Sequence, residues 1–193
     1  MSLRRTNADR SSSTRAHVIA ASRSLFAAVG CADTSMAQIA AAAGVSTGAL
    51  YHHWATKNEL LAAVVSDLHR EIAAEIRTAT GARRSPLQRF EAAAAVFLRR
   101  CADRDVGRIL LVEGPGILGD RWDELDRRWW LTPTEDLLNE AVAAGELTTE
   151  NPRLLAMALL GSLTALGRHV ARSSASDEHE VAFRALRDVI KGL

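Results

Sequence analysis

The segment from Thr34 to Tyr51 constrains the fold more than any other part of the chain. Gly44 stands between two short helix-forming stretches, and glycine adopts a positive φ without steric cost where a chain reverses. Ser35 and Gln38 have the spacing of a capping box, and Ser46 can cap a second helix. The spacing therefore predicts two short helices joined by a tight glycine turn.

The second predicted helix has one buried side and one exposed side. Leu50 and Trp54 lie one turn apart and are expected to point inward. The residues left on the opposite face are small or polar: Thr47, Gly48, Tyr51 and His52. This layout is that of a helix-turn-helix, which places its second helix in the major groove of DNA. An ordinary helical hairpin has the same turn, so the turn by itself leaves both interpretations open.

Helices predicted on both sides of this pair favour the DNA-binding interpretation. An amphipathic pattern from Thr14 to Val29 predicts a preceding helix that ends at Gly30. Thr56 and Glu59 have capping-box spacing and predict a long following helix. Lys57 lies in its first turn, where the helix dipole disfavours a cation by about 0.3–1 kcal/mol and a DNA phosphate would be bound. A solvated surface lysine is the alternative for this residue.

Positive charge is concentrated near the N-terminus, although the formal net charge of the whole chain is +1. Residues 1–58 contain 6 Lys or Arg and 2 Asp or Glu, whereas the remainder contains 18 and 21. This asymmetry suits contact of the N-terminal part with phosphates. Residues 1–13 are polar, arginine-containing and serine-rich, and we expect them to form a flexible basic arm. The arm either follows the DNA or has no fixed role.

The sequence after residue 65 is a succession of capped helices without strand-like alternation. Helices are expected to open at Ser85–Pro86 and Asn151–Pro152, and a break or kink is expected at Thr132–Pro133. About nine helices are predicted in all. We therefore expect an all-α chain with a three-helix helix-turn-helix domain over residues 14–65 and a helical bundle over residues 66–193.

The helix predicted after Pro152 is apolar on nearly all sides, which requires burial against more than one neighbour. We expect this helix and the last one to form an interface with a second copy of the chain. The expected interface residues are Leu155, Leu159, Leu166, Leu186 and Val189. A central position within a monomer is the alternative.

Large apolar and aromatic side chains of the C-terminal part are expected to line a ligand cavity. Three tryptophans within nine residues exceed what the packing of a small bundle needs, and a mostly apolar pocket uses a few polar groups for direction. The expected lining residues are Phe90, Phe97, Leu110, Leu111, Glu113, Leu118, Trp122, Trp129, Trp130 and His169. An ordinary core or surface role is the alternative for each of them.

The sequence carries no recognisable catalytic motif. Its histidines and cysteines lack metal-ligand spacing, and there is no phosphate-binding loop, nucleophile elbow or dinucleotide fingerprint. We therefore expect no enzymatic activity, no metal and no cofactor. No apolar run approaches the ~20 residues of a membrane span, and the two cysteines lie far apart. A reduced, cytoplasmic protein without membrane contact is expected.

Residues from about Thr14 to Val65 resemble the DNA-binding domain of the TetR family of bacterial transcriptional regulators. The matching residues are Leu25–Phe26, Gly30, Thr34–Met36, Ile39–Ala40, Gly44–Ser46, Gly48, Leu50–Tyr51, His53, Lys57 and Leu60–Leu61. Cys31, Trp54 and Ala55 depart from the family's pattern without removing a group that faces DNA.

This resemblance implies a ligand-responsive regulator, most often a repressor, that binds a palindromic double-stranded DNA operator as a homodimer and is released by a small molecule. The effector is expected to be largely apolar. DNA contacts are expected from Ser35, Ser46, Thr47, Gly48, Tyr51, His52 and Lys57. These side chains are short, so DNA shape is expected to contribute to specificity. An all-helical enzyme and an effector-independent architectural DNA-binding protein are the alternatives.

Overall fold

The computed structural model describes residues 7–81 and 84–192, with side chains described from Ser13 onwards in the first helix. All regular elements in this part of the chain are helical. They are α1 (Asn7–Val29), α2 (Met36–Ala43), α3 (Thr47–His53), α4 (Lys57–Thr80), α5 (Pro86–Cys101), the π-helical segment η1 (Val106–Glu113), α6 (Gly114–Leu118), α7 (Asp120–Asp126), the π-helical segment η2 (Arg127–Leu131), α8 (Thr132–Ala143), α9 (Pro152–Arg172) and α10 (Glu178–Ile190).

The predicted all-α fold is confirmed. Segment η1 continues directly into α6, and α7 continues through η2 into α8, so the described residues form nine continuous helical rods. Of the break or kink expected at Thr132–Pro133, the break is wrong, because the chain stays helical there and the π-helical turns of η2 precede the proline. The kink stays a prediction. A π-helix is a wider turn that commonly marks a functional position.

The predicted boundary of the N-terminal arm is wrong. Helix α1 begins at Asn7, so residues 7–13 are helical and continuous with the helix expected from Thr14. No glycine or proline occurs between Asn7 and Val29, so no helix-breaking residue separates the polar segment from the amphipathic one. The rest of the predicted arm, residues 1–6, lies outside the described residues.

Local capping fixes the helix-turn-helix as the sequence predicted. Ser35 and Gln38 form a capping box at the start of α2, and Gly44 ends that helix with a φ of 67°. Ser46 caps α3 by accepting a hydrogen bond from the backbone N–H of Ala49 at 3.1 Å. Because each of these contacts joins residues close in sequence, the shape of the turn is specified by the local sequence.

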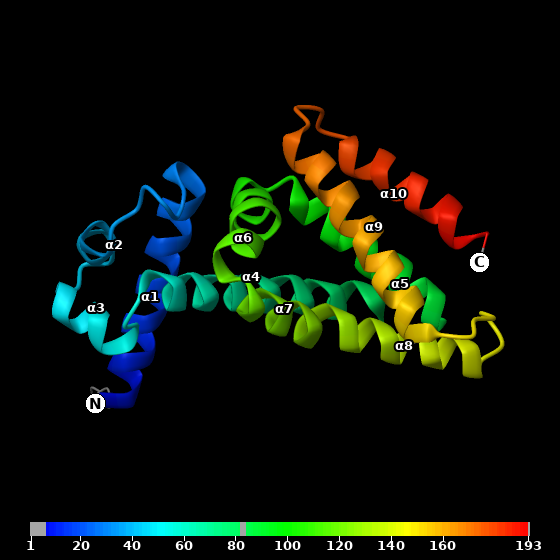
Figure 1. Cartoon of the computed structure of the whole chain (residues 1–193), viewed down its shortest axis with the longest axis horizontal. Coiled ribbons are helices and arrows are strands. Elements are labelled where there is room, and N and C mark those ends of the chain that lie inside the picture. The colour runs from blue at the N-terminus through cyan, green and yellow to red at the C-terminus, as the bar shows by residue number, and fades with distance from the viewer. Residues whose placement is uncertain (1–6, 82–83, 193) are drawn as a thin grey trace, which may run out of the picture.

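The first three helices form a small head at one end of the molecule (Figure 1). Its core contains Phe26, Ile39 and Leu50, all fully buried, together with Trp54, which is 4% exposed. Helix α4 begins beside α3 and runs from the head into the larger part of the protein (Figure 1). The expected domain boundary at residue 65 therefore falls within a single continuous helix.

Helix α5 lies inside the larger part and packs on α4, α8, α9 and α10. Helices α9 and α10 lie at the end of the molecule away from the head (Figure 1). The approach of α9 to α5 requires Gly167, because a Cβ atom there would lie 2.9 Å from the Sγ of Cys101. The bundle therefore places the C-terminal helices far from α3 and on a different surface.

Helix α9 is, among the described residues, the one helix long and apolar enough to cross a membrane by length and composition alone. This property was not predicted from the sequence, because the prediction rested on an uninterrupted apolar run and polar residues interrupt α9. One side of α9 packs on α5, α8 and α10, and less than a third of its most apolar 18-residue window is buried. The structure thus leaves a large apolar side of α9 uncovered in the single chain.

Candidate DNA-binding and effector sites

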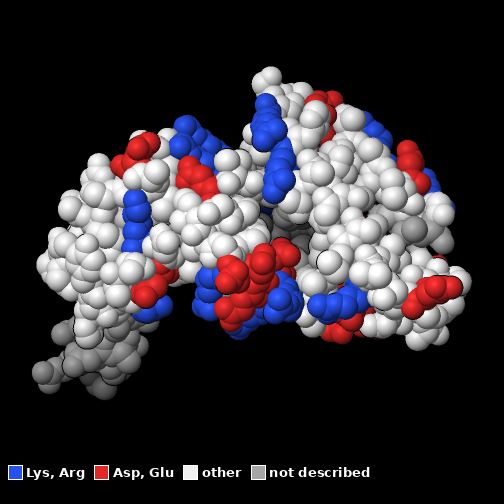
Figure 2. All heavy atoms as spheres, in the orientation of Figure 1, with Lys and Arg blue, Asp and Glu red and all other residues white. Residues whose placement is uncertain are grey.

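Helix α3 presents the predicted reading face to solvent. Thr47, Gly48, Tyr51 and His52 are all exposed, while Leu50 on the opposite side is fully buried. The helix carries no Lys or Arg, and the lobe that contains it shows few charged side chains on the face drawn in Figure 2. A Cβ atom added at Gly48 would meet no protein atom within 4 Å. The surface at Gly48 is therefore open for close approach by another molecule.

The two predicted serine contacts are exposed, and each also serves as a helix cap. The Ser35 hydroxyl receives the backbone N–H of Gln38 at 3.2 Å and donates to the Gln38 side chain at 2.9 Å. The Ser46 hydroxyl receives the backbone N–H of Ala49. These bonds fix the direction of both hydroxyls at the starts of α2 and α3.

Lys57 is held by the protein itself to a greater extent than the sequence suggested. Its Nζ donates to the backbone carbonyls of Ala32 and Thr34 at 3.1 Å and 2.9 Å. These carbonyls offset the unfavourable position of a cation at the start of α4. An ammonium group has three N–H donors, so one donor remains for a phosphate. The Glu59 carboxylate of the expected capping box instead accepts from the N–H of Ala55 at 2.8 Å.

Arg15 is a candidate phosphate contact that the sequence analysis did not identify. Its guanidinium lies 4.8 Å from the ring centroid of Trp54, the residue that directly follows α3. The side chain is exposed, and stacking on the indole holds the charge beside the end of the reading helix. Nothing in the local sequence links residues 15 and 54, because the contact exists only once α1 packs on α2 and α4.

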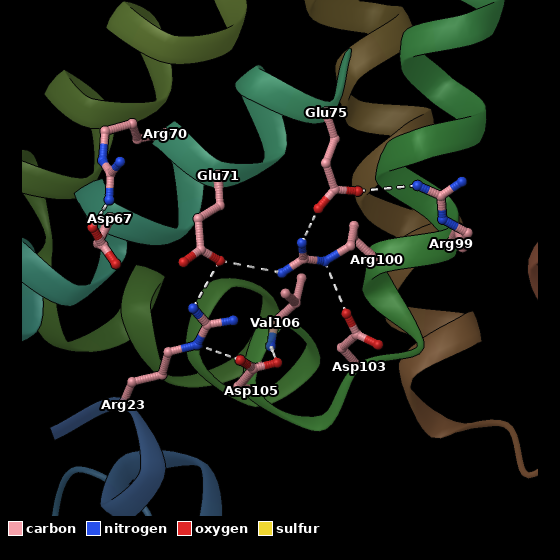
Figure 3. Close-up of polar contacts among 10 residues, drawn as sticks. All are labelled: Arg23, Asp67, Arg70, Glu71, Glu75, Arg99, Arg100, Asp103, Asp105 and Val106. Atoms are coloured by element: carbon pink, nitrogen blue, oxygen red, sulfur yellow. Dashed lines mark hydrogen bonds and ion pairs between the residues drawn. The ribbon is translucent and has the colours of Figure 1, made fainter. Parts of the chain in front are cut away.

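An ion-pair network ties the head to the larger domain (Figure 3). Arg23 of α1 pairs with Glu71 of α4 at 2.8 Å and with Asp105 just before η1. Arg100 of α5 lies on the other side of Glu71 and pairs with it at 3.6 Å. Arg100 also pairs with Glu75 and with Asp103, so charged groups from α1, α4, α5 and the start of η1 form one connected set.

A second contact joins the end of α1 to the end of η1. Arg108 pairs with Glu113 at 2.7 Å and donates to the carbonyl of Val29 at 2.8 Å, while Glu113 accepts the backbone N–H of Cys31 at 2.7 Å. Gly30 permits this approach, because a Cβ there would lie 2.5 Å from Arg108 Nη2, and its φ of 99° is itself disfavoured for other residues. We call this group, Arg108, Glu113 and the backbone of residues 29–31, the junction clamp.

A cavity of about 760 Å³ lies within the larger domain. The side chains around it come from α4, α5, η1, α6, α7, η2, α8 and α9, and both π-helical segments contribute to its wall. Seven of the residues expected to line a ligand cavity do line it: Phe90, Phe97, Leu110, Leu111, Trp122, Trp129 and Trp130. Its size and its largely aromatic and aliphatic wall are those of a small-molecule site.

The other three residues predicted for the cavity lie elsewhere. Glu113 belongs to the junction clamp, and Leu118 lines a separate, smaller hollow beside α4. His169 is exposed on α9 and lies 2.9 Å from a carboxylate oxygen of Glu178. For each of the three, helix periodicity predicted whether the position is apolar or polar. It could not predict which neighbouring helix the side chain would contact.

His69 is the buried polar residue of the cavity wall, and the sequence analysis missed it. It is 2% exposed, and burial lowers its pKa to about 4, so the imidazole is neutral. Its Nδ1 receives the indole N–H of Trp130 at 2.5 Å. His69 stands between Val65 and Ile72 on the apolar stripe of α4. Its place on this stripe was the feature of the sequence from which its burial could have been predicted.

The outward faces of α9 and α10 form an uncovered apolar strip, whose members are Leu154, Met157, Ala158, Gly161, Ala165, Val181, Ala185 and Val189. Met157, Val189 and Leu154 are 51%, 56% and 59% exposed. Two residues predicted for a dimer interface, Leu159 and Leu186, instead lie in the core of the chain at 3% and 1% exposure. Leu155 and Leu166 are half-buried, and Val189 alone of the five is on the strip.

The two cysteines are buried, and burial disfavours their thiolate form. Burial raises the pKa of Cys101 to about 12, and burial is also the largest cause that raises the pKa of Cys31. They form no disulfide with each other. Within the part of the chain that the structure describes, no group of three or more His, Cys, Asp or Glu side chains could hold a metal ion.

An exposed helix-turn-helix joined by ion pairs to a helical domain with an internal cavity defines the class of a DNA-binding regulator with a separate ligand domain. Comparisons with known proteins give the family. The sequence model for "Bacterial regulatory proteins, tetR family" matches residues 18–64, and that for "Tetracyclin repressor-like, C-terminal domain" matches residues 87–193.

Two related sequences and one solved structure indicate the same family. The HTH-type transcriptional regulator SrpR of Pseudomonas putida is 30% identical over 149 residues, which cover 74% of this chain and 68% of SrpR. The regulator CymR of the same species is 42% identical over 69 residues, about a third of either chain. A TetR-family regulator from Pectobacterium atrosepticum superposes with a TM-score of 0.80, at 27% identity, over 98% of this chain and 97% of that one.

The chain therefore belongs to the TetR family of transcriptional regulators. Like the other members of this family, it is a ligand-responsive DNA-binding regulator.

Proposed function

We propose that this protein works in the cytoplasm as a homodimeric repressor that binds a palindromic operator and releases it when a small molecule fills the cavity. One observation carries the proposal: the reading face of α3 and the apolar strip of α9 and α10 are both exposed and lie at opposite ends of one chain. Pairing of two strips would cover the apolar surface and present two heads, as a two-fold operator requires.

On the DNA, Thr47, Gly48 and His52 face the base edges, and Tyr51 contacts the backbone from the same helix. Phosphate contacts come from Ser35, Ser46, the free donor of Lys57 and the guanidinium of Arg15, and the support for them is the cap at the start of α3, the third N–H of Lys57 and the position of Arg15 beside Trp54. Because α3 has no Lys or Arg, charge-assisted base contacts are absent from it and the shape of the groove contributes to specificity.

The effector signal passes through η1. The same eight residues supply Leu110 and Leu111 to the cavity wall and Arg108 and Glu113 to the junction clamp. A ligand that moves η1 therefore moves the end of α1, and with it the head. An effector that favours the released position by about 1–3 kcal/mol changes operator affinity by about 5- to 150-fold.

Selection of bound fragments from random double-stranded DNA with the full chain tests the operator. The expected result is an inverted repeat with half-sites about 34–36 Å apart, or one turn of DNA. Selection of a single half-site, or of no sequence at all, would contradict the proposal.

Substitution of Arg15 and Tyr51 then tests the contacts on that operator. Arg15→Ala should weaken binding about 5-fold and reduce the slope of log affinity against log salt by about 0.9, the value for one lost phosphate contact. Tyr51→Ala should weaken binding without changing the slope, because Tyr51 carries no charge. Arg121→Ala, an exposed change on α7, is the matched control and should change neither quantity.

A further inference from the structure

The cavity wall contains a polar side chain, His69, of which only one of the two ring nitrogens has a hydrogen-bond partner among the described residues. His69 lies among Trp122, Trp129 and Trp130, with ring centroids 5.9 Å, 6.2 Å and 5.2 Å from its own. Trp129 stacks on the imidazole with an interplanar angle of 12°. All four residues line the cavity, so His69 forms the polar centre of an aromatic wall.

Geometry fixes which nitrogen of His69 carries the proton. Trp130 Nε1 lies 2.5 Å from His69 Nδ1, and an indole N–H can only donate. Nδ1 must therefore accept, which places the single ring proton of the neutral imidazole on Nε2. Nε2 is buried and has no hydrogen-bond partner among the described residues. The wall of the cavity thus holds a buried, uncharged N–H donor that the protein does not use; the Nε of Arg89, a charged group on the same lining, is a second buried donor without a partner among the described residues.

An unused buried donor is uncommon and costly, because the group has lost water without gaining an acceptor. A ligand that brings an acceptor to Nε2 gains the hydrogen bond and relieves that cost. A ligand of the same shape without an acceptor gains neither. Nε2 is covered in this structure, so a ligand reaches it only if a neighbouring side chain moves, and the partly buried indoles of Trp122 and Trp129 are the candidates.

The charges around the cavity favour a neutral ligand. The charges of the lining nearly balance, because four arginines stand against three acids: Arg77, Arg89, Arg128 and Arg168 against Asp126, Asp136 and Glu140. All of them except Arg89 and Asp126 are exposed, and Arg89 pairs with Glu140. Asp126, on the same lining as His69, is partly buried, and its pKa is raised first by burial and then by Asp123. A second anion beside Asp126 would be repelled and would lose its own hydration.

We propose that the Nε2–H of His69 is the specificity-determining donor of the cavity, and that the effectors are neutral, flat aromatic molecules with a hydrogen-bond acceptor such as a ring nitrogen or a carbonyl. This inference rests on the proposed function of the cavity as the effector site. The tryptophans supply faces for stacking, and His69 distinguishes an acceptor-bearing ring from a plain hydrocarbon.

Quinoline and naphthalene form a matched pair of probes, because they share one shape and differ in a single ring nitrogen. Calorimetric titration of the full chain at a pH of about 8, where quinoline is neutral, should give about tenfold tighter binding of quinoline. His69→Phe should bring the two affinities to within about twofold while leaving naphthalene binding in place. His17→Phe, at an exposed histidine of α1, is the control and should preserve the tenfold preference.

Nitrogen NMR of the ¹⁵N-histidine-labelled wild-type chain tests the same donor without a substitution. The expected result is a protonated Nε2 and an unprotonated Nδ1 for His69, with the Nε2 proton shifted downfield by quinoline and not by naphthalene. Protonation at Nδ1, or an unmoved Nε2 proton in the quinoline complex, would overturn the proposal.

The outcomes separate this inference from the proposed function. Equal binding of both probes would remove the role of His69 and leave the cavity as a ligand site. Binding of neither probe would overturn the ligand class. Operator binding, measured without any probe, tests the regulator itself and is independent of both results.

Discussion

The head and the cavity domain are both built from helices, but the contacts that specify them differ in their separation along the chain. The head is defined by contacts between residues three or four apart: the Ser35 capping box, the Gly44 turn and the Ser46 cap. The cavity is lined by residues from eight elements spread over α4 to α9. A surface that binds DNA can therefore be specified locally, whereas a cavity is specified only by the assembled bundle.

The two regions also treat charge differently. The reading helix is free of Lys and Arg, and the cations near it, Arg15 and Lys57, are held by Trp54 and by backbone carbonyls. At the junction, Arg23 and Arg100 lie within connected ion pairs (Figure 3). Charge in the head is thus available to an external partner, and charge at the junction is paired internally.

The largest effect is expected at the apolar strip, where the proposal needs two heads to act together. Met157→Glu should give a folded monomer in light scattering and weaken operator binding by about 100-fold or more, because the second head no longer binds in the same complex. Val142→Glu, at an exposed position of α8, should leave the dimer intact.

Leu159→Glu sharpens the same test, because Leu159 is in the core of the chain and not on the strip. A buried carboxylate there should prevent folding instead of giving a folded monomer. A folded monomer from Leu159→Glu, or an intact dimer from Met157→Glu, would contradict the interface proposed for α9 and α10.

The next largest effect is the acid sensitivity of the cavity domain. His69 stays neutral in the folded chain until about pH 4, whereas in the unfolded chain it takes up a proton near pH 6.5. Between these values the unfolded state binds more protons, so stability falls as the pH falls. The contribution of His69 to the free energy of unfolding should decline by about 3 kcal/mol across this window.

Urea denaturation at several pH values measures this decline. Wild type should lose more stability between about pH 6.5 and pH 4 than His69→Phe does, and the difference isolates His69 from the carboxylates. His17→Gln should follow the wild-type curve. Parallel curves for wild type and His69→Phe would show that His69 is not buried in its neutral form.

A smaller effect is expected at the junction clamp. Gly30→Ala should lower the free energy of unfolding by about 2 kcal/mol, because its φ of 99° is strained for alanine and the new Cβ meets Arg108 and Glu113. Gly145→Ala, with a φ of 71° and no neighbour within 4 Å, carries the backbone strain alone and should cost less. If urea denaturation showed equal losses of unfolding free energy for the two variants, Arg108 and Glu113 would accommodate the new Cβ without an energetic cost.

The smallest effect separates folding from DNA reading in the head. Gly48→Ala should stabilise α3 by up to about 1 kcal/mol, because glycine is a poor helix former and the added Cβ meets no protein atom. The same methyl should weaken operator binding by about fivefold, because it stands on the reading face. Gly116→Ala, also free of neighbours, is the control for stability without a change in DNA affinity. Unchanged affinity of Gly48→Ala would place Gly48 away from the bases.

Predictions from the sequence were right where the pattern of a single helix was enough to locate a residue. Capping residues gave the starts of α5 and α9 at Ser85 and Asn151, and seven of the ten expected cavity residues were on the right stripes. Predictions failed where two sides of one helix are both apolar. On α9 the pattern could not tell Leu159, which packs inside the chain, from Met157, which faces out.

The amino-acid sequence by itself determined the helical elements, the shape of the glycine turn and the family, because caps, turn residues and apolar periodicity act between neighbours in the chain. The tertiary structure alone decided that Arg15 stacks on Trp54, that Glu113 clamps the head, and that His69 meets three tryptophans. These contacts join residues separated by tens of positions, and their partners are set by which faces of the helices the bundle brings together.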